Sequence, residues 1–415
     1  MQFEHEAKIV IKVESSNLEE ILLSFLKSLA PVFGDLVSAI LLHYALEYGI
    51  NGHLSHLLGL SEGDKWHWKS KKGYKSITIH TLFGKVKLPN PVVEIVRQDG
   101  KKEKKVIGRK LLEVSSYAQI PDFMKKILGS LGGLMSFRNV EKSMKSFGIF
   151  RVCLSSIWRS VGWTAARLTL LVKAKGGQDE IIEADATGVS TLNSGKRGSE
   201  AKIVMQRNET GGLTFLGVKV GKYGSKADWK ALFAPLEALI ATGKRCILVA
   251  DGDDTPINEW KIIGKRGYAF FQRCLWHIPH QLKYMLWKDK ATKVEKTSIL
   301  SLCYAAFILR KDVPLEEFAQ YIQLKIARIE NLIAECTKLG FKTCATFLNN
   351  AKGFAFVSGR DTQHNHNTSL TERAMRTIKQ RTKYAVWSDK GAENVIKIRL
   401  DTFYNHSFKG LHFGT

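Results

Sequence analysis

The sequence predicts a multidomain α/β protein. Its 415 residues are too many for one ordinary hydrophobic core and suggest roughly two to four folding units. Hydrophobic residues make up 44% and charged residues 25% of the chain, a composition that argues against a largely disordered protein. In the second half, strand patterns alternate with helical ones, and the first half adds helices and a strongly basic segment with a period of two.

The charge of the chain predicts a polyanionic partner. Lysine and arginine number 63 against 39 aspartates and glutamates, which gives a formal net charge of +24. Residues 65–110 alone hold fourteen basic residues and three acidic ones. Basicity concentrated in one segment is typical of a nucleic-acid contact surface. A generally basic protein with no polyanionic partner is the alternative.

The cysteines and the apolar stretches indicate a protein of a reducing, aqueous compartment. No Cys-x2-Cys pair is present, so the cysteines do not suggest a disulfide framework. The first residues, MQFEHEAKIV, do not form a signal peptide. Charged or polar residues such as Asp35, Glu47 and Arg159 interrupt the apolar stretches, so no membrane span is expected. We therefore predict a cytoplasmic, nucleoid-associated protein.

The first 118 residues divide into a helical region, 1–62, and a basic β-hairpin unit, 63–118. Apolar residues recur at helical spacing between positions 17 and 50, which predicts one or two amphipathic helices. From 76 to 108 the period changes to two, and Asp99-Gly100 between alternating runs predicts a hairpin turn. The predicted DNA contacts of this unit are the lysines after the turn: Lys101, Lys102, Lys104 and Lys105.

Residues 64–75 interleave lysines with Trp66, Trp68 and Tyr74. Such a mixture could supply positive charge to phosphates and flat faces to bases. The alternative is a solvated loop whose tryptophans pack inward, and the sequence does not decide between the two.

Residues 119–175 have the layout of a helix-turn-helix DNA-binding domain. Ser136 can cap a helix that runs from Phe137 to about position 147, and Gly148 supports a tight turn. Ser155 or Ser156 can cap a second helix, on which Arg159 is a predicted DNA contact. Any two packed helices could give the same pattern, so packing alone remains an alternative.

The remaining chain predicts one α/β domain with a helical insertion. EIIEADATGVS, EAKIVMQRN and TFLGVKVG indicate three strands, followed by a helix from about 226 to 242. CILVADGDD and YAFFQRC indicate two more strands, and this order is expected of an RNase H-like sheet over residues 176–277. Residues 278–361 form the predicted insertion, and residues 362–415 complete the domain. One helical face of the insertion is predicted to be core: Leu315, Phe318, Ile322, Ile326, Ile329 and Ile333.

Three acidic residues stand at positions that can converge. Asp185 is expected at the end of the first strand of this domain, Asp251 at the end of the fourth, and Glu372 at the start of a later helix. Adjacent parallel strands would bring the two aspartates to one edge of the sheet. Three carboxylates together repel one another unless cations lie between them, and Mg²⁺ or Mn²⁺ prefers oxygen ligands. Two such ions can promote an in-line phosphoryl transfer.

Each acid also has an ordinary structural interpretation. Asp185 could begin a turn, and Asp251 could belong to a polar loop with Asp253 and Asp254. Glu372 lies three residues after Ser369, the spacing of a capping box. From the sequence alone, the capping interpretation of Glu372 is the stronger one.

Cys274 and His277, in QRCLWH, could form half of a zinc site. Zinc needs further ligands, and no second pair with finger spacing is visible in the sequence. His364 and His366 are weak candidates to complete the site.

Together, these motifs resemble those of the Mutator-like DDE transposases of prokaryotic insertion sequences. The resemblance covers about residues 136–405 and depends on DATG, ADGDD, QRC-x-x-H and the Glu-Arg pair that opens the last helix. The ending RTKYAVWSDKGAENVIKIRL is also similar to the tail of these transposases. One departure is that many similar proteins carry cysteine pairs in the basic β unit, whereas this chain has none before Cys153. A zinc ribbon is therefore not expected there.

The resemblance implies an RNase H-like catalytic domain that cleaves and joins DNA at element ends. Asp185, Asp251 and Glu372 would bind two Mg²⁺ or Mn²⁺ ions per active site. Cys274 and His277 would support that site, and Arg373 and Arg376 are predicted to contact DNA together with the lysines named above. The implied partners are double-stranded terminal repeats, target DNA and a second copy of the chain.

Two other functions remain open. The first is another RNase H-like enzyme, such as a structure-selective nuclease or resolvase, which would cut branched DNA without joining it. The second is a non-catalytic DNA-binding protein derived from a transposase, which would use only its basic hairpin and its helix-turn-helix. The acidic triad argues against the second alternative.

Overall fold

The computed structural model describes residues 58–70, 76–81, 84–88, 90–107, 120–146, 152–168, 179–192, 198–208, 211–264, 268–310, 313–357 and 369–406, with positions 32, 36, 170 and 172. The chain forms two compact units, residues 1–167 and residues 168–415. The helices predicted between 17 and 50 lie outside the described residues, apart from the helical positions 32 and 36.

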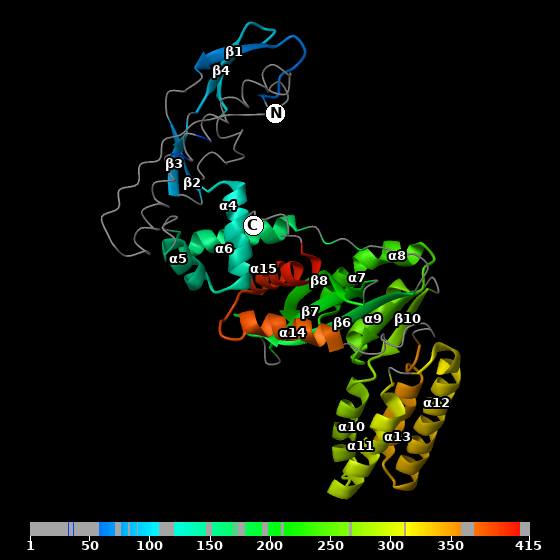
Figure 1. The fold of residues 1–415 in the computed structure, drawn as a ribbon. Coiled ribbons are helices and arrows are strands. Elements are labelled where there is room, and N and C mark those ends of the chain that lie inside the picture. Colours follow the sequence, from blue (N-terminus) through cyan, green and yellow to red (C-terminus); the bar gives the residue numbers. More distant parts are fainter. Residues whose placement is uncertain are drawn as a thin grey trace. The chain divides into compact units, whose positions relative to one another are not determined.

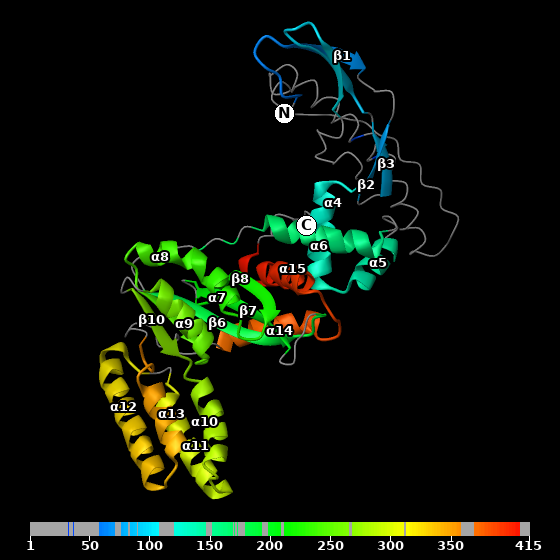
Figure 2. The same ribbon diagram turned by 180° about the vertical axis from the view of Figure 1, so that it is seen from behind.

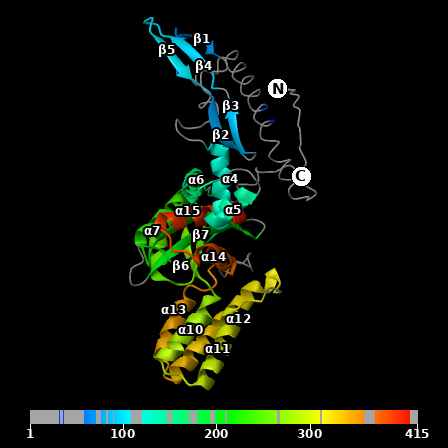
Figure 3. The same cartoon turned by 90° about the vertical axis from the view of Figure 1, so that its left-hand side faces the viewer.

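Two small antiparallel sheets form the basic part of the first unit (Figure 3). One sheet has the order β1-β4-β5, from Lys65–Ser70, Val92–Val96 and Lys102–Val106. The other pairs β2, Ile77–Thr81, with β3, Gly84–Leu88. Gly100 has φ +77°, which glycine adopts without strain, and the Lys101 amide donates to Asp99 Oδ1 over 3.0 Å. The predicted turn at Asp99-Gly100 is therefore confirmed.

Residues 65–70, within the segment 64–75 for which two interpretations were open, form strand β1 and not a solvated loop. Its alternate side chains are exposed and half-buried, so that Trp66 and Trp68 share one face. Both rings pack against a core that includes Val93 and Ile95, and their centroids lie 5.7 Å apart. The two tryptophans thus pack inward, and the lysines of β1 alternate with them on the solvent side.

Three helices complete the described part of the first unit: α4, Asp122–Leu134; α5, Phe137–Ser146; and α6, Leu154–Arg167. The Ser136 hydroxyl accepts a hydrogen bond from the Asn139 amide at 3.1 Å, which confirms the predicted cap of α5. The predicted cap of α6 is wrong, because this helix already begins at Leu154, before Ser155 and Ser156. Helices α4 and α6 pack closely at Gly129, where a Cβ would lie 2.7 Å from the Ser160 carbonyl oxygen.

A five-stranded mixed sheet forms the centre of the second unit, in the order β10-β9-β6-β7-β8. Its strands are β6, Glu180–Val189; β7, Ser199–Arg207; β8, Leu213–Lys222; β9, Cys246–Ala250; and β10, Ala269–Arg273. Strands β6, β7 and β8 are antiparallel neighbours, whereas β9 runs parallel to both β6 and β10. The five strands predicted for this region are therefore confirmed, and the sheet is a mixed α/β sheet.

Helices cover both faces of this sheet (Figures 1 and 2). On one face lie α7, Lys226–Phe233, α8, Glu237–Ala241, and α9, Asp254–Ile263, which share a core with Ile182 of β6. On the other lie α14, Ser369–Thr382, and α15, Asp389–Leu400, followed by the π-helical turn η2, Asp401–Asn405. The single helix predicted over 226–242 is interrupted by the 3-10 turn η1, Ala234–Leu236, which contains Pro235.

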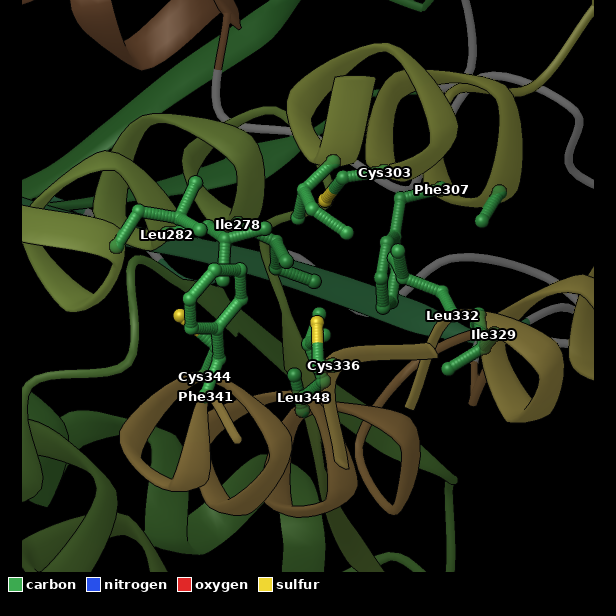
Figure 4. Close-up of a cluster of buried hydrophobic side chains, with 14 of the residues drawn as sticks. Ile278, Leu282, Cys303, Phe307, Ile329, Leu332, Cys336, Phe341, Cys344 and Leu348 are labelled. Carbon is green, nitrogen blue, oxygen red and sulfur yellow. The ribbon is translucent and has the colours of Figure 1, made fainter. Parts of the chain in front are cut away.

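The chain between β10 and α14 folds into helices with a core of their own (Figure 4). These are α10, His277–Lys288; α11, Lys293–Phe307; α12, Leu315–Lys338; and α13, Lys342–Lys352. Ile278 and Leu282 of α10 meet Phe307 of α11 and Ile329 of α12 in this core. The Asp289 carboxylate accepts the amides of Thr343 and Cys344 over 3.1 and 2.8 Å and so caps α13.

The cysteines and the hydropathy of the helices add two findings. All six cysteines are free thiols, five of them buried. Within the described ranges, no helix combines the length and the apolar character that a membrane crossing requires.

Candidate active site

The two aspartates lie on neighbouring parallel strands, at the level where β9 ends. The last register pair of β6 and β9 is Glu183 with Val249, and Asp251 directly follows the final residue of β9. Asp185 was expected at the end of its strand but lies in the middle of β6, since β6 continues beside β7 up to Val189. The strand is longer than β9 because its antiparallel partner β7 is longer, so Asp185 sits just past the end of its parallel neighbour.

The environment of Asp185 disfavours its charge. Burial, followed by the charge of Asp251, raises the pKa of Asp185 from 3.8 to about 7, and Glu372 adds to the rise. The Ala186 amide, which donates to Asp185 Oδ1 over 2.8 Å, and the imidazole of His277 oppose it. The fold thus holds carboxylates close enough to repel one another, in a place where water screens them poorly.

His277 is the cation that links these aspartates to Glu372. Its Nε2 lies 3.1 Å from Glu372 Oε1. Burial lowers the pKa of His277, but the Cys274 thiol and the charges of Asp185 and Asp251 outweigh burial and raise it to about 9. The Cys274 amide donates to the Ala250 carbonyl over 2.7 Å, which places this turn directly beside the end of β9. The predicted supporting pair, Cys274 and His277, therefore lies at the acidic end of the sheet.

A buried network fixes the first turn of α14 to β6. The hydroxyl of Thr371 donates to Glu183, and Arg207 Nε donates to the other oxygen of the same carboxylate over 2.5 Å. All three side chains are buried, and burial raises the pKa of Glu183 despite its partners. Glu372, the next residue after Thr371, is thereby held near Asp185. In the sequence, Glu183 could have been noticed only as a charged residue within an otherwise apolar strand pattern.

The carboxylate of Glu372 has a partner outside its own helix, because its Oε1 pairs with His277 Nε2. A capping glutamate would accept the backbone amide of the cap residue, and the side chain of Ser369 and the residues before it lie outside the described part of the chain. Asp253 does have the ordinary role considered for its cluster, because its side chain caps α9 by accepting the Thr255 amide over 3.3 Å.

A second network positions the loop that carries Asp251. Gln281 of α10 donates to the Asp251 carbonyl oxygen over 2.9 Å and accepts from Arg273 Nη2 over 2.6 Å. The Arg273 guanidinium lies against Gly252, whose φ is +103°, and a Cβ there would lie 2.7 Å from Arg273 Nε. Sequence reasoning missed Arg273 and Gln281 as parts of the site, since their contacts join segments that only the fold brings together.

The chemistry of the donor set decides which ion it could hold. A pair of carboxylates that raises the pKa of Asp185 suits a hard divalent cation, which would remove the repulsion between them. In the described part of the chain, no three His, Cys, Asp or Glu side chains are grouped so that they could hold an ion. The aspartate pair offers oxygen ligands of the kind that a hard cation prefers, but Glu372 does not complete a set of three, since it is paired with His277. His364 and His366, considered for zinc, lie outside the described residues.

The predicted DNA-contacting residues are spread over both units. Lys101, Lys102 and Lys104 are exposed, whereas Lys105 is half-buried and donates to the Leu58 carbonyl over 3.0 Å. Arg159 is exposed on α6, and Arg373 and Arg376 are exposed on α14. Lys105 therefore combines partial burial with a contact to a backbone carbonyl, whereas Lys101, Lys102 and Lys104 are exposed.

No protein-family profile matches the chain, and no curated protein matches it.

Proposed function

We propose that this protein is a DDE transposase that cleaves DNA at the ends of an insertion sequence and joins those ends to target DNA. The observation that carries the proposal is the pair Asp185 and Asp251 on adjacent parallel strands, with Glu372 brought beside them by α14. The strand order, three antiparallel strands extended by two parallel ones, supports an RNase H-like domain. The helices α10–α13 between β10 and α14 support the insertion expected before the third acid.

Asp185 and Asp251 are the residues that would hold Mg²⁺ or Mn²⁺. Glu372, which pairs with His277 in this structure, would become the third ligand only on turning toward the aspartates. When bound, two such ions supply charge for the attacking and the leaving oxygen of an in-line displacement. His277 holds Glu372 at 3.1 Å and offers a positive charge beside the aspartates. Gln281 and Arg273 orient the main chain of Asp251, which limits the movement of its carboxylate.

The proposed chemistry has two steps. In the first, the oxygen of a water molecule bonds to phosphorus and the bond to the 3′ oxygen breaks, which releases a 3′-hydroxyl. In the second, that 3′ oxygen bonds to a phosphorus of target DNA and displaces another 3′ oxygen, so the number of phosphodiester bonds is conserved. Neither step requires a covalent bond between protein and DNA.

DNA binding would depend mainly on the first unit and on α14. Lys101, Lys102 and Lys104 offer exposed charge for phosphates, and α5 and α6 are candidates for a helix-turn-helix. Double-stranded element ends, target DNA and a second copy of the chain are the proposed partners.

A structure-selective nuclease is the second candidate, because the same acidic residues would serve hydrolysis alone. The joining of a 3′-end to target DNA distinguishes a transposase from a nuclease. Purified protein would be incubated with Mg²⁺, a labelled duplex that ends in the DNA flanking the gene, and a supercoiled target plasmid. A transposase transfers the label to the plasmid through a 3′-end, and Asp251→Asn abolishes the transfer. Cleavage of a four-way junction without any transfer would instead support the nuclease.

A further inference from the structure

Helix α10 carries an exposed row of aromatic side chains. Tyr284 and Trp287 are 68% and 70% exposed, and Trp276, which precedes the helix, is 45% exposed. Together with the half-buried His280, these residues follow each other at intervals of four, four and three positions, which places them on one helical face. The rings of Trp276 and His280 lie 5.4 Å apart. We call Trp276, His280, Tyr284 and Trp287 the α10 aromatic row.

The aromatic row is not part of the core of its own helical region. Ile278 and Leu282 point from the other side of α10 into that core (Figure 4), and Leu286 is buried in it as well. The helix therefore has a complete apolar face without the aromatic residues. Large aromatic side chains with most of their surface in water are unusual, and several of them on one face indicate a binding surface.

The charge around the aromatic row indicates the class of partner. Lys283 and Lys288 are exposed on the same helix, and the α10 sequence HIPHQLKYMLWK contains no acidic residue. Asp289, the first acid after the helix, has its carboxylate turned to the amides of α13. A partner that brings negative charge and flat rings satisfies both features. Two copies of this face would instead repel each other through their lysines.

The aromatic row also begins beside the acidic site. Trp276 is the neighbour in sequence of His277, whose imidazole contacts Glu372. From there the row extends along α10 for roughly 16 Å, at about 1.5 Å per residue. A strand that leaves the acidic site could continue directly onto this face.

We propose that the α10 aromatic row binds single-stranded DNA by stacking unpaired bases on Trp276, Tyr284 and Trp287, while Lys283 and Lys288 contact its phosphates. Sequence-tolerant binding of this kind combines a basic surface with aromatic platforms. The inference rests on the proposed function in one respect: the bound strand would be the DNA opened next to the cleavage site.

The test compares binding of fluorescein-labelled oligothymidylate and of a blunt mixed-sequence duplex by the full-length protein, measured by fluorescence anisotropy. Trp287→Ala should raise the Kd for oligothymidylate by about 5- to 150-fold, the range measured for removal of one base–aromatic stack. The Kd for the duplex should stay within about twofold, because duplex binding depends on charge elsewhere. Leu324→Ala, which removes an exposed apolar side chain from α12, should change neither Kd.

Two further variants distinguish stacking from apolar contact. Trp287→Phe keeps a ring and should restore most of the affinity, whereas Trp287→Leu keeps only the apolar surface and should behave like Trp287→Ala. A double variant, Tyr284→Ala with Trp287→Ala, that binds oligothymidylate as tightly as the wild type would overturn the proposal. Two other results would also overturn it. One is a wild-type dimer, seen by analytical ultracentrifugation, that the double variant disrupts. The other is tighter binding of oligouridylate than of oligothymidylate.

A failure of the α10 proposal can be distinguished from a failure of the proposed transposase function. Asp185→Asn should bind oligothymidylate like the wild type and yet not cleave DNA. If Asp185→Asn cleaves normally, the proposed function fails while the anisotropy data on α10 stay interpretable. Thermal melting of each variant confirms that it is folded.

Discussion

Like charges are gathered in two regions of this protein, under opposite conditions. In the hairpin of β4 and β5, four lysines follow the turn at Gly100, but three of them are exposed, and Lys101 and Lys105 have acidic partners at 3.0 and 3.5 Å. At the end of β9, Asp185 and Asp251 are held together where burial and mutual repulsion raise the pKa of Asp185 to about 7. Water screens the first group, whereas the second is unfavourable for the fold itself.

The comparison shows which charges carry information about function. Exposed lysines cost little stability, so their presence is compatible with binding or with solubility alone. A carboxylate pair that destabilises the free protein is better explained by a ligand that relieves the repulsion. The acidic end of the sheet is therefore stronger evidence for chemistry than the hairpin is for DNA binding.

The largest expected effect would follow from removal of one aspartate. Asp251→Asn should reduce Mg²⁺-dependent nicking of a plasmid with the flanking DNA by roughly 10³-fold or more, since the metal contribution is worth several kcal/mol. Binding of the same DNA should be unchanged. Asp254→Asn, at the start of α9, is the matched control. Wild-type nicking by Asp251→Asn would remove the acidic end from the active site.

Glu372→Gln distinguishes a ligand from a capping residue. Gln can replace a capping glutamate, so a cap would lose well under ~1 kcal/mol of stability and no activity. As a metal ligand, Glu372 must supply charge, and we expect nicking to fall by roughly a hundredfold or more while the variant stays folded. Thermal melting and nicking are measured on the same preparation. Normal results in both would exclude Glu372, and Asp389 and Glu393 would be examined next.

The next prediction concerns the thermal stability of the metal-free protein. Here the loss of an aspartate should be a small gain, in contrast to the loss of activity expected above. The pKa of Asp185 is raised from 3.8 to about 7, so the folded state binds more protons than the unfolded state between these values. The contribution of Asp185 to the stability of the wild type should thus fall as the pH rises through this window. Asp185→Asn removes the penalty, so in EDTA its Tm advantage over the wild type should grow from about pH 4 to about pH 8. An advantage that is constant with pH would contradict the repulsion.

The smallest expected effect concerns the hairpin lysines. Replacing Lys101, Lys102 and Lys104 by alanine should weaken the dependence of DNA binding on salt. The slope of log Kd against log salt concentration should fall by about 0.9 for each phosphate that the variant no longer neutralises. Lys105→Ala should leave that slope unchanged, because Lys105 already donates to Leu58. Equal slopes for the wild type and the triple variant would mean that the hairpin faces away from DNA.

The sequence predicted the strands of the central sheet from their apolar runs. An apolar run that ends in acids correctly placed Asp251 after β9, whereas Asp185 lies within β6, because its pairing with β7 extends that strand. The turn at Gly100 and the burial of Phe318 and Ile329 on α12 were predicted for equally local reasons. Strand β1 was not predicted, because residues 64–75 were interpreted either as a nucleic-acid contact or as a solvated loop, although KWHWKS alternates with a period of two. The contacts of Glu372 with His277, and of Arg273 with Gln281, join distant segments, and no local pattern encodes them.

The central claim is that Asp185 and Asp251 form a binding site for a divalent cation. Calorimetric titration of the full-length protein with Mn²⁺ at about pH 6.5 tests it most directly, since a bound cation must displace the proton that a pKa of about 7 leaves on Asp185. The expected result is saturable binding with proton release in the wild type, and the disappearance of both in Asp185→Asn and in Asp251→Asn. Identical titrations of the wild type and of both variants would contradict the claim.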